Sequence, residues 1–577
     1  MHHSIRLSRL LAAAFIFAAA VSPADADEAL ALSVYATAGD VLNHLRTPDA
    51  RAQATRVLRS LHVSRIFLEG RRGDEYVPVE ALREIRAALG EAGFACSGGI
   101  ATVPGSAFGT RQQGGLGWLN WESEKTQRDV AGFFTENAPV FEELIVDDFY
   151  CTGDESADSA RARGPRSWSQ YRRDLLVSLV EPLVVKPARA AHPGVRLILK
   201  YPQWYDRFHL FGYDPPRMSP PFDQVWVGTE VRDPQTRRMG FVHPTQGYIN
   251  FRWLNSVAGP KVRGAWFDHI ECSAQNFVDQ AYLSVLAGAR ELTLFRLGDL
   301  MQSHPGDALL ERRWPDLQEL AGKVRGQAPA GLAYYKPPGS DADENLYLPD
   351  YLAMIGLPVV PVAQYPAPAR AVFLARPAAA DTNILDRMQS HLAQGGTVVL
   401  TPAFVRAAGA AAARLAGVEV GAASVPSETR AVRAGAAAIE LETPLELDAA
   451  MKAADASVLM TAVVGTGSVP FLTRREAGRG SVLAVNLRTF SEQDFRDAGE
   501  WLLAPKRRGL PDIPEALANP LRAVLLAPLG IAFEAPAGVG LFLFGGSRCL
   551  YNFRGQEARV RLEGQALTLP AHGWRWR

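Results

Sequence analysis

Two adjacent carboxylates, Asp147 and Asp148, end the short apolar run from Leu144 to Val146. Burying part of an acidic pair beside a hydrophobic strand costs free energy unless opposite charge, hydrogen bonds or chemistry compensates. Functional side chains of parallel α/β proteins gather at the carboxyl ends of strands, so the position of the pair predicts a site. Because adjacent strand residues point to opposite sides, we assign Asp148 to the chemistry and Asp147 to its support.

Several other short apolar runs also end in charged residues, whereas the beginnings of these runs are mainly apolar or neutral. If the runs are strands of one parallel barrel, their ends converge on a single mouth. A polar loop after a strand is common in any protein, so one such residue decides little. The set is more informative, because several members adjoin aromatic residues that suit a plain solvated loop poorly. The members are Glu69, Asp147, Asp148, Lys200, Glu230, Arg232, Asp268 and Glu271.

Aromatic residues lie close to these charges in the sequence. Trp118, Trp121 and Trp204 occur in segments with Gly, Pro and Asn, where a role in the core is less natural, and we predict that they are platforms for sugars. Trp226 and Trp266 lie within predicted strands, and packing in the core is their favoured interpretation. Rings that stack on the apolar faces of sugars, together with carboxylates that bind hydroxyls, predict a carbohydrate site.

A carbohydrate site with facing carboxylates predicts glycoside hydrolysis, in which one acid protonates the leaving oxygen and a second carboxylate attacks carbon or activates water. Repulsion between like charges in a crowded acidic mouth separates the pKa values of the two groups. We predict that Asp148 is the nucleophile or stabilising carboxylate and that Glu230 is the general acid/base. Asp268 and Glu271 compete with Glu230 for the role of the acid.

Basic residues at the same strand ends are predicted to bind substrate oxygens or to balance the acidic charge. Lys200 and Arg232 are the two candidates, and Glu69 is a further predicted substrate-binding residue. An ordinary salt bridge to Asp147 explains Lys200 equally well. No His/Cys cluster and no H-E-x-x-H motif calls for a metal, so we expect neither a metal nor another cofactor.

Residues from about 30 to 325 repeat a unit of short apolar strand followed by amphipathic helix. Eight such units in about 300 residues predict a (β/α)8 barrel. The competing fold, a doubly wound open sheet, would require a Gly-rich first turn to bind a nucleotide. The segment Tyr35 to Gly39 lacks the pattern G-x-G-x-x-G. Helices are predicted at Val79 to Leu89, Trp168 to Ala191 and Gln275 to Gly288. The predicted strands are Leu32 to Tyr35, Arg65 to Glu69, Phe94 to Ser97, Leu144 to Asp148, Val195 to Lys200, Gln224 to Glu230, Gly264 to Asp268 and Glu291 to Phe295.

Two further regions are predicted after the barrel, which we assign to residues 27–328. Strands and helices alternate in residues 329–420 and predict a flavodoxin-like α/β domain, in which no nucleophile elbow or phosphate loop occurs. Residues 421–577 are expected to be β-rich, with a β-sandwich at the end that braces the barrel.

The first 26 residues predict a secretory signal peptide. Arg6 and Arg9 precede the apolar run from Leu10 to Val21, and Ala24-Asp25-Ala26 follows as an A-x-A cleavage site. The apolar run is too short to span a bilayer. We therefore expect an exported protein, secreted or periplasmic, and the Arg/Ala-rich composition favours a bacterial source.

The balance of charge favours a neutral partner. Lys plus Arg equals Asp plus Glu at 61 residues each, so neither nucleic acid nor an anionic membrane is indicated, and a carbohydrate fits better. The four cysteines lack C-x-x-C spacing. In an oxidising compartment Cys96 and Cys151 could form a disulfide, and two buried thiols are the equal alternative.

The end of the fourth predicted strand resembles signatures of two groups of barrel glycosidases. The pair Asp147-Asp148 resembles the adjacent aspartates of the protein O-GlcNAcase family, which divide acid/base work and orientation of an N-acetyl group. Asp148 with Glu230 resembles the strand-four nucleophile and strand-six acid/base of the α-galactosidase superfamily.

The order of domains resembles β-galactosidases that carry a glutamine-amidotransferase-like trimerisation domain. This resemblance implies homo-oligomerisation through the flavodoxin-like domain. Those enzymes place catalytic glutamates after strands four and seven, whereas strand four here supplies Asp147 and Asp148, so their activity is not carried over.

Taken together, the residues predict an exported glycosidase that acts on a neutral or weakly charged oligosaccharide or polysaccharide. Two alternatives stay open: an inactive carbohydrate-binding barrel protein, and another carbohydrate-active enzyme such as a polysaccharide lyase. The distance between the two carboxyl groups would indicate the stereochemistry, because about 5 Å implies retention and roughly 6.5 to 9.5 Å implies inversion.

Overall fold

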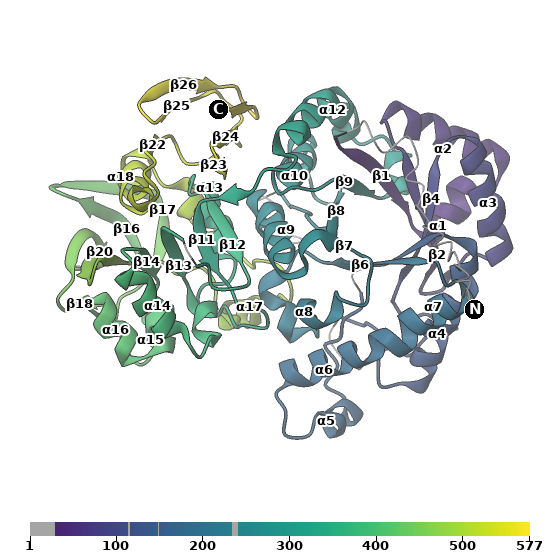
Figure 1. Cartoon of the computed structure of the whole chain (residues 1–577), viewed down its shortest axis with the longest axis horizontal. Helices are drawn as coiled ribbons and strands as arrows, with labels where there is room; N and C mark the ends of the chain where they lie inside the picture. The colour runs from purple at the N-terminus through teal and green to yellow at the C-terminus, as the bar shows by residue number, and fades with distance from the viewer. Residues whose placement is uncertain (1–28, 114–115, 148, 234–239, 368) are drawn as a thin grey trace, which may run out of the picture.

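The N-terminal half of the chain folds into a closed (β/α)8 barrel (Figure 1). This computed structural model describes residues 29–113, 116–147, 149–233, 240–367 and 369–577. The barrel strands are β1 (Ala31–Ala36), β2 (Arg65–Arg72), β4 (Ala95–Ala101), β5 (Glu143–Val146), β6 (Arg196–Tyr201), β7 (Gln224–Gly228), β8 (Val262–Asp268) and β9 (Glu291–Phe295). Because β1 pairs in parallel with both β2 and β9, the sheet closes on itself. The predicted barrel is confirmed, and the open doubly wound sheet is excluded.

Large side chains fill the lumen of the barrel. Trp226 and Trp266 are buried there and pack with Tyr35 and other apolar residues of the strands. Trp226 Nε1 donates a hydrogen bond to Thr293 Oγ1 at 2.7 Å. A Cβ atom at Gly264 would collide with the indole of Trp226, so this position requires glycine. The favoured interpretation of both tryptophans as core residues is confirmed.

Helices cover the outside of the barrel (Figure 1). In α3 (Val79–Glu91), the buried residues Ala81, Leu82, Ile85 and Leu89 repeat every three to four positions, and this stripe packs toward β2 and β4. The long helix predicted for residues 168–191 is present as α6 (Trp168–Val180), a π-helical turn η4 (Glu181–Val185) and α7 (Lys186–Ala191). The other long helices are α2 (Pro48–Ser60), α4 (Glu124–Asn137), α9 (Thr245–Ala258), α10 (Ala274–Leu286) and α12 (Pro305–Val324).

A nine-stranded mixed sheet forms the second domain (Figure 1). Its strands, in spatial order, are β12 (Val359–Val362), β11 (Leu332–Tyr335), β13 (Ala371–Leu374), β14 (Thr397–Leu400), β21 (Gly480–Val485), β20 (Gly467–Ala477), β19 (Ser457–Val464), β16 (Pro426–Ala434) and β17 (Ala437–Asp448). The first five pair in parallel and the others add in antiparallel fashion. Its helices are α13 (Leu348–Met354), α14 (Ile384–Ala393), α15 (Pro402–Ala408) and α16 (Ala410–Ala416).

The predicted boundary at residue 420 falls inside this sheet and is wrong. Strand β21 pairs in parallel with β14 and in antiparallel fashion with β20, so one continuous sheet runs from the flavodoxin-like part into the antiparallel part. Every residue of β21 is buried. Its parallel partner lies about 80 residues earlier, and local sequence patterns do not report pairing over such a separation.

The C-terminal region is β-rich, as predicted. One small sheet contains β10 (Pro329–Ala330), β23 (Val539–Phe544), β24 (Ser547–Asn552) and β27 (Trp574–Trp576), and another contains β22 (Phe533–Glu534), β25 (Ala558–Leu562) and β26 (Gln565–Leu569). The first sheet begins with the residues that leave the barrel. Tyr551 on β24 donates a hydrogen bond to Asp279 on α10 at 2.6 Å, which ties this region to the barrel. No helix among the described residues is long and apolar enough to cross a membrane.

The second domain packs against the barrel beside the carboxyl end of β6. The 3-10 helix η5 (Tyr205–Leu210) follows this strand. Tyr205 Oη donates to Asp350 Oδ1 at 2.7 Å, and Lys336 Nζ lies 3.1 Å from Asp206 Oδ1. These buried polar contacts hold the segment after β6 in a fixed position against the second domain.

Candidate active site

Glu69, on β2, is fully buried at the mouth of the barrel. Its carboxylate accepts hydrogen bonds from Tyr35 Oη at 2.7 Å, from the backbone N–H of Ala38 at 2.8 Å, and from Arg72 Nε and Nη2 at 2.9 and 2.8 Å. Burial raises the pKa of Glu69, and Arg72 and Tyr35 oppose that shift by stabilising the ionised form. Glu69 is therefore a fully bonded carboxylate.

Arg72 connects this carboxylate to the acidic residue that follows β5. Its Nη2 donates to Asp147 Oδ2 at 2.8 Å. Lys200 Nζ, on β6, lies 3.6 Å from Asp147 Oδ1 and donates to Glu230 Oε1 at 3.0 Å. Acidic and basic groups thus alternate from β2 to the segment after β7. The alternation balances the charge of carboxylates that are removed from water.

Glu230 differs from the other described carboxylates of the mouth. Its Oε1 is bonded to Lys200, whereas its Oε2 is buried and has no hydrogen-bond partner among the described residues. A Cβ atom at Gly228 would collide with this Oε2, so the glycine makes room for the carboxylate above the end of β7. A buried oxygen without a donor costs free energy until a ligand or water reaches it. Glu230 is therefore the described carboxylate best placed to exchange a proton or to accept a hydroxyl.

Asp268, at the end of β8, forms a second acidic centre with Arg232. Arg232 Nη1 and Nη2 lie 2.8 and 3.1 Å from the two carboxylate oxygens, and the backbone N–H of Ile270 donates to Oδ1 at 3.0 Å. Burial raises the pKa of Asp268 to about 6, and Arg232 opposes that shift. Glu271 lies just beyond, half-buried, in a left-handed conformation with φ of 51°.

The structure thus brings Glu69, Asp147, Lys200 and Glu230 into one network, and it pairs Arg232, in the segment after β7, with Asp268 at the end of β8. The salt bridge between Lys200 and Asp147, one of the two interpretations of this lysine, is present. Asp148 lies outside the described residues, so its role as nucleophile and the supporting role of Asp147 both stay predictions.

The prediction that Trp118, Trp121 and Trp204 are platforms for sugars is wrong, because all three side chains are buried. The rings of Trp118 and Trp204 stack on each other with centroids 5.8 Å apart, and both pack against Phe211. Trp121 Nε1 donates to the carbonyl of Cys151 at 2.8 Å. Their neighbours Gly, Pro and Asn suggested exposed loops, but the rings face one another and leave little surface for a sugar.

Arg72 and Tyr35 were missed by the sequence analysis, although both contact Glu69. Arg72 is three residues after Glu69, a spacing that would place the two side chains on opposite faces of a regular strand. The register between β2 and β4 shifts between Glu69 and Arg71, and this irregularity brings Arg72 to the side of Glu69. The sequence shows that Arg72 is charged, but the direction of its side chain depends on the bulge in β2.

One cluster of described residues has a composition suited to a metal ion: the ligand atoms of His269, His304 and Asp307 all lie within 4.8 Å of one another. His269 Nε2 is 2.6 Å from Asp307 Oδ1. His304 Nδ1 accepts a hydrogen bond from the backbone N–H of Gly306 at 3.0 Å and so caps α12. Metal binding through that nitrogen would break the cap, and we assign no metal to the cluster.

Cys96 is a free thiol, so the disulfide to Cys151 that was one of two alternatives is not formed. Burial raises the pKa of the Cys96 thiol to about 12, which keeps it protonated at neutral pH.

Comparison with known proteins identifies two matching regions. Residues 19–324 match the family described as "Probable glycosyl hydrolase, catalytic domain", and residues 328–490 match "Uncharacterized protein SSO3021, second domain". The uncharacterized protein SSO3021 of Saccharolobus solfataricus is 25% identical over 339 residues, which are 52% of this chain and 55% of that protein. The chain therefore matches about half the length of this curated relative.

Solved structures of glycosidases share the whole architecture. A GH42 β-galactosidase from G. stearothermophilus has a TM-score of 0.63 at 11% identity and covers 95% of this chain and 98% of its own. The β-galactosidase from Bacillus circulans sp. alkalophilus has a TM-score of 0.63 at 12% identity, with the same coverages of 95% and 98%. The α-L-fucosidase isoenzyme 2 from Paenibacillus thiaminolyticus has a TM-score of 0.62 at 11% identity and covers 92% and 93%.

At these identities the likeness establishes the fold alone, and it confirms the predicted order of barrel, mixed sheet domain and β-rich region. The family match establishes more than the fold, because the matched residues 19–324 are over half of the chain. The chain belongs to the family described as probable glycosyl hydrolase, catalytic domain, and its first domain is a glycoside hydrolase barrel.

Proposed function

We propose that this protein is an exported glycosidase that hydrolyses an oligosaccharide or polysaccharide at the carboxyl end of its barrel. The observation that carries the site assignment is the geometry of Glu230, whose Oε2 is buried without a hydrogen-bond partner among the described residues. A group that transfers protons to a substrate must have an oxygen that the protein does not already occupy. Both oxygens of Glu69 and of Asp268, by contrast, are bonded within the protein.

In this proposal Glu230 acts as the acid/base, and the end of β5 supplies the second carboxylate. Asp148 is the predicted reacting residue and Asp147 its support. Lys200 Nζ lies 3.6 Å from Asp147 Oδ1 and 3.0 Å from Glu230 Oε1. Lys200 thus joins the predicted acid/base to the residue that is predicted to support Asp148.

Lys200 has a defined part in this arrangement. Its ammonium lies between Asp147 and Glu230 and 4.4 Å from the centroid of the Trp266 ring. Lys200 therefore balances the charge of two carboxylates that are removed from water.

The experiment is a hydrolysis screen of the mature protein on neutral oligosaccharides and polysaccharides, followed by matched variants. Glu230→Gln keeps the size of the side chain and removes its acid/base function, so we expect turnover to fall by about 10² to 10⁴-fold. Glu291→Gln is the control. Glu291 is also a buried glutamate with one unbonded oxygen, but it lies at the amino end of the barrel.

Equal activity of the Glu230→Gln and wild-type proteins would reject the assignment. Asp148→Asn and Asp268→Asn, measured in parallel, identify the second carboxylate. A wild-type protein that binds glycans but releases no sugar would favour the inactive carbohydrate-binding barrel. An unsaturated product that absorbs in the ultraviolet would favour a polysaccharide lyase.

Two further parts of the proposal concern location and assembly. Residues 1–26 are proposed to direct export to the periplasm or the medium, and N-terminal sequencing of the mature protein should begin near Asp27. Recovery of the uncleaved chain in the cytoplasm would reject export. Homo-oligomerisation through the mixed-sheet domain is tested by sedimentation, in which a monomer at all concentrations would reject it.

A further inference from the structure

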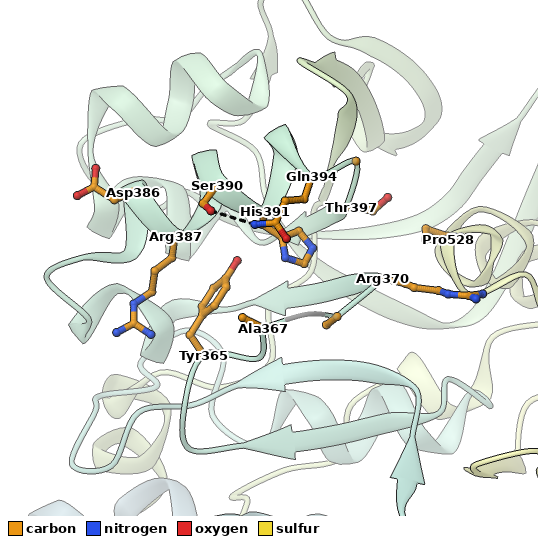
Figure 2. A pocket seen from close by; sticks show the side chains of 13 residues that line it. Tyr365, Ala367, Arg370, Asp386, Arg387, Ser390, His391, Gln394, Thr397 and Pro528 are labelled. Atoms are coloured by element: carbon orange, nitrogen blue, oxygen red, sulfur yellow. Dashed lines mark hydrogen bonds between the residues drawn. The ribbon is translucent and has the colours of Figure 1, made fainter.

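The second domain contains a cavity of about 690 Å³, within the roughly 300 to 1,000 Å³ typical of small-molecule sites. It lies between α14 and the segment that joins β12 to β13 (Figure 2). Its lining includes Tyr365, Arg370, Arg387, His391 and Thr397. None of the lining residues belongs to the barrel, so this cavity is separate from the proposed active site.

Two polar atoms in the lining are buried without a hydrogen-bond partner among the described residues. They are Oη of Tyr365 and Nε2 of His391. His391 is only 6% exposed. Figure 2 shows the Tyr365 hydroxyl directed to the side of the cavity where Ser390 and His391 lie. Burying such atoms costs free energy unless a ligand or an ordered water bonds to them. The cavity therefore offers unused hydrogen-bonding groups.

Packing fixes these two groups in place. The ring of Tyr365 makes an edge contact with Tyr335, with centroids 5.4 Å apart, and the guanidinium of Arg387 lies 5.6 Å from its centre. A Cβ atom at Gly396 would collide with the imidazole of His391, so the glycine lets the chain cross close to this ring. Groups that are already oriented lose little entropy when a ligand binds.

The charged residues of the lining are Arg370, Arg387 and one acidic residue, Asp386. Arg387 Nε lies 3.0 Å from Asp381 Oδ2, so its charge is balanced within the protein. Arg370 makes no salt bridge with any described carboxylate, and its Nη1 donates only to the carbonyl of Leu529 at 3.4 Å. An arginine without an acidic partner at the edge of a cavity attracts a carboxylate or another anion. Burial lowers the pKa of His391, so the imidazole is neutral at pH 7 and adds no charge.

We propose that this cavity binds an acidic sugar, with its carboxylate at Arg370 and its hydroxyls at Tyr365, His391 and Ser390. A hydroxyl both donates and accepts, which matches the phenol, imidazole and serine groups of the lining. The aromatic face of Tyr365 provides apolar contact for a sugar ring. The choice of a sugar rests on the proposed glycosidase function, whose products are sugars, whereas the carboxylate rests on Arg370 alone. The site itself rests on the cavity.

The test is isothermal titration calorimetry of the full-length protein with three probes: D-glucuronate, D-glucose as its uncharged match, and inorganic phosphate as an anion without a sugar. We expect glucuronate to bind at least about tenfold more tightly than the other two, because glucose lacks the carboxylate and phosphate lacks the sugar hydroxyls. Tyr365→Phe removes only the hydroxyl, and Arg370→Gln removes the guanidinium together with its charge. Each should weaken glucuronate binding about tenfold.

Matched variants separate this site from the barrel and from general effects of charge. Arg433→Gln removes an exposed arginine of the same sheet and should leave binding unchanged. Glu230→Gln should also leave glucuronate binding unchanged, even if it abolishes hydrolysis. Thermal unfolding of each variant confirms that it is folded.

Three results would overturn the proposal. One is that the wild-type protein binds none of the probes or binds phosphate as tightly as glucuronate. Another is that Tyr365→Phe and Arg370→Gln bind glucuronate like the wild type. The third is that Glu230→Gln abolishes binding, which would place the ligand in the barrel. A protein that hydrolyses no glycan but passes these tests would reject the proposed enzymatic function and retain the cavity.

Discussion

The two ends of the barrel both bury carboxylates, but they balance the negative charge differently. At the amino end, Glu143 contacts Arg65 and Arg196, whose side chains are 24% and 55% exposed. At the carboxyl end, Lys200 and Arg232 are 2% and 4% exposed. Solvent screens the amino-end pairs, whereas the protein alone must balance the charge of the pairs that Lys200 and Arg232 form.

This comparison corrects the expectation that the strands begin mainly with apolar or neutral residues. Arg65, Glu143, Arg196 and Glu291 are the first residues of β2, β5, β6 and β9. Charged residues at strand ends therefore do not by themselves distinguish a functional mouth from an ion-pair cluster that stabilises the opposite face. The most deeply buried basic residues, Lys200 and Arg232, lie at the carboxyl end, whereas Arg72 at that end is 22% exposed, close to the 24% of Arg65.

The largest expected difference in stability between the two ends comes from replacing one basic residue at each end. Lys200→Met leaves Asp147 and Glu230 without their shared cation in a buried site, and we expect a loss of about 3 to 5 kcal/mol in the stability of the barrel. Arg196→Met removes a half-exposed partner of Glu143 and should cost no more than about 1 kcal/mol. Denaturant unfolding followed by tryptophan fluorescence measures both. Similar costs would contradict the distinction between the ends.

A smaller difference is expected from two glycines that each make room for a side chain. Gly264→Ala, near the amino end, forces the alanine against Trp226 and should lower stability by about 1 to 3 kcal/mol through overpacking. Gly228→Ala, at the carboxyl end, meets the carboxylate of Glu230 and should displace it. We expect this variant to lose activity out of proportion to its change in melting temperature. If Gly228→Ala retained full activity, the position of Glu230 would not matter for turnover.

The smallest expected effect is a pH dependence of stability at the carboxyl end. Because burial raises the folded-state pKa of Asp268 to about 6, its contribution to stability is fully present below its unfolded pKa of about 4 and is lost as the pH rises through about 6. Asp268→Asn should flatten this part of the profile of melting temperature against pH. Asp158→Asn, which changes an exposed carboxylate, is the control and should leave the profile unchanged. An unaltered slope in Asp268→Asn would contradict the raised pKa.

Much of the fold could be predicted from the sequence, because hydrophobic periodicity reports which face of a segment is buried. All eight predicted barrel strands are present, and the strand from Glu291 to Phe295 has the predicted bounds. The strand end carrying Asp147, and the charges of Lys200, Glu230 and Asp268, were also found from the sequence, because a charged residue after an apolar run is a local signal.

Other features could not be predicted, since they depend on partners that are distant in the sequence. The stacking of Trp118 on Trp204 buries two rings whose flanking residues suggest exposed loops. The sheet that continues through residue 420 depends on the pairing of β14 with β21. Both contacts join segments that are about 80 residues apart, and no local pattern encodes such pairing.

The sequence by itself determined the strand and helix pattern of a barrel and the chemical types at its strand ends. The tertiary structure decided how these groups meet: a bulge in β2 brings Arg72 beside Glu69, and Lys200 comes to lie between Asp147 and Glu230. The physical reason is that burial and periodicity are local properties of the chain. The partners of a buried charge, by contrast, are set only when the barrel closes.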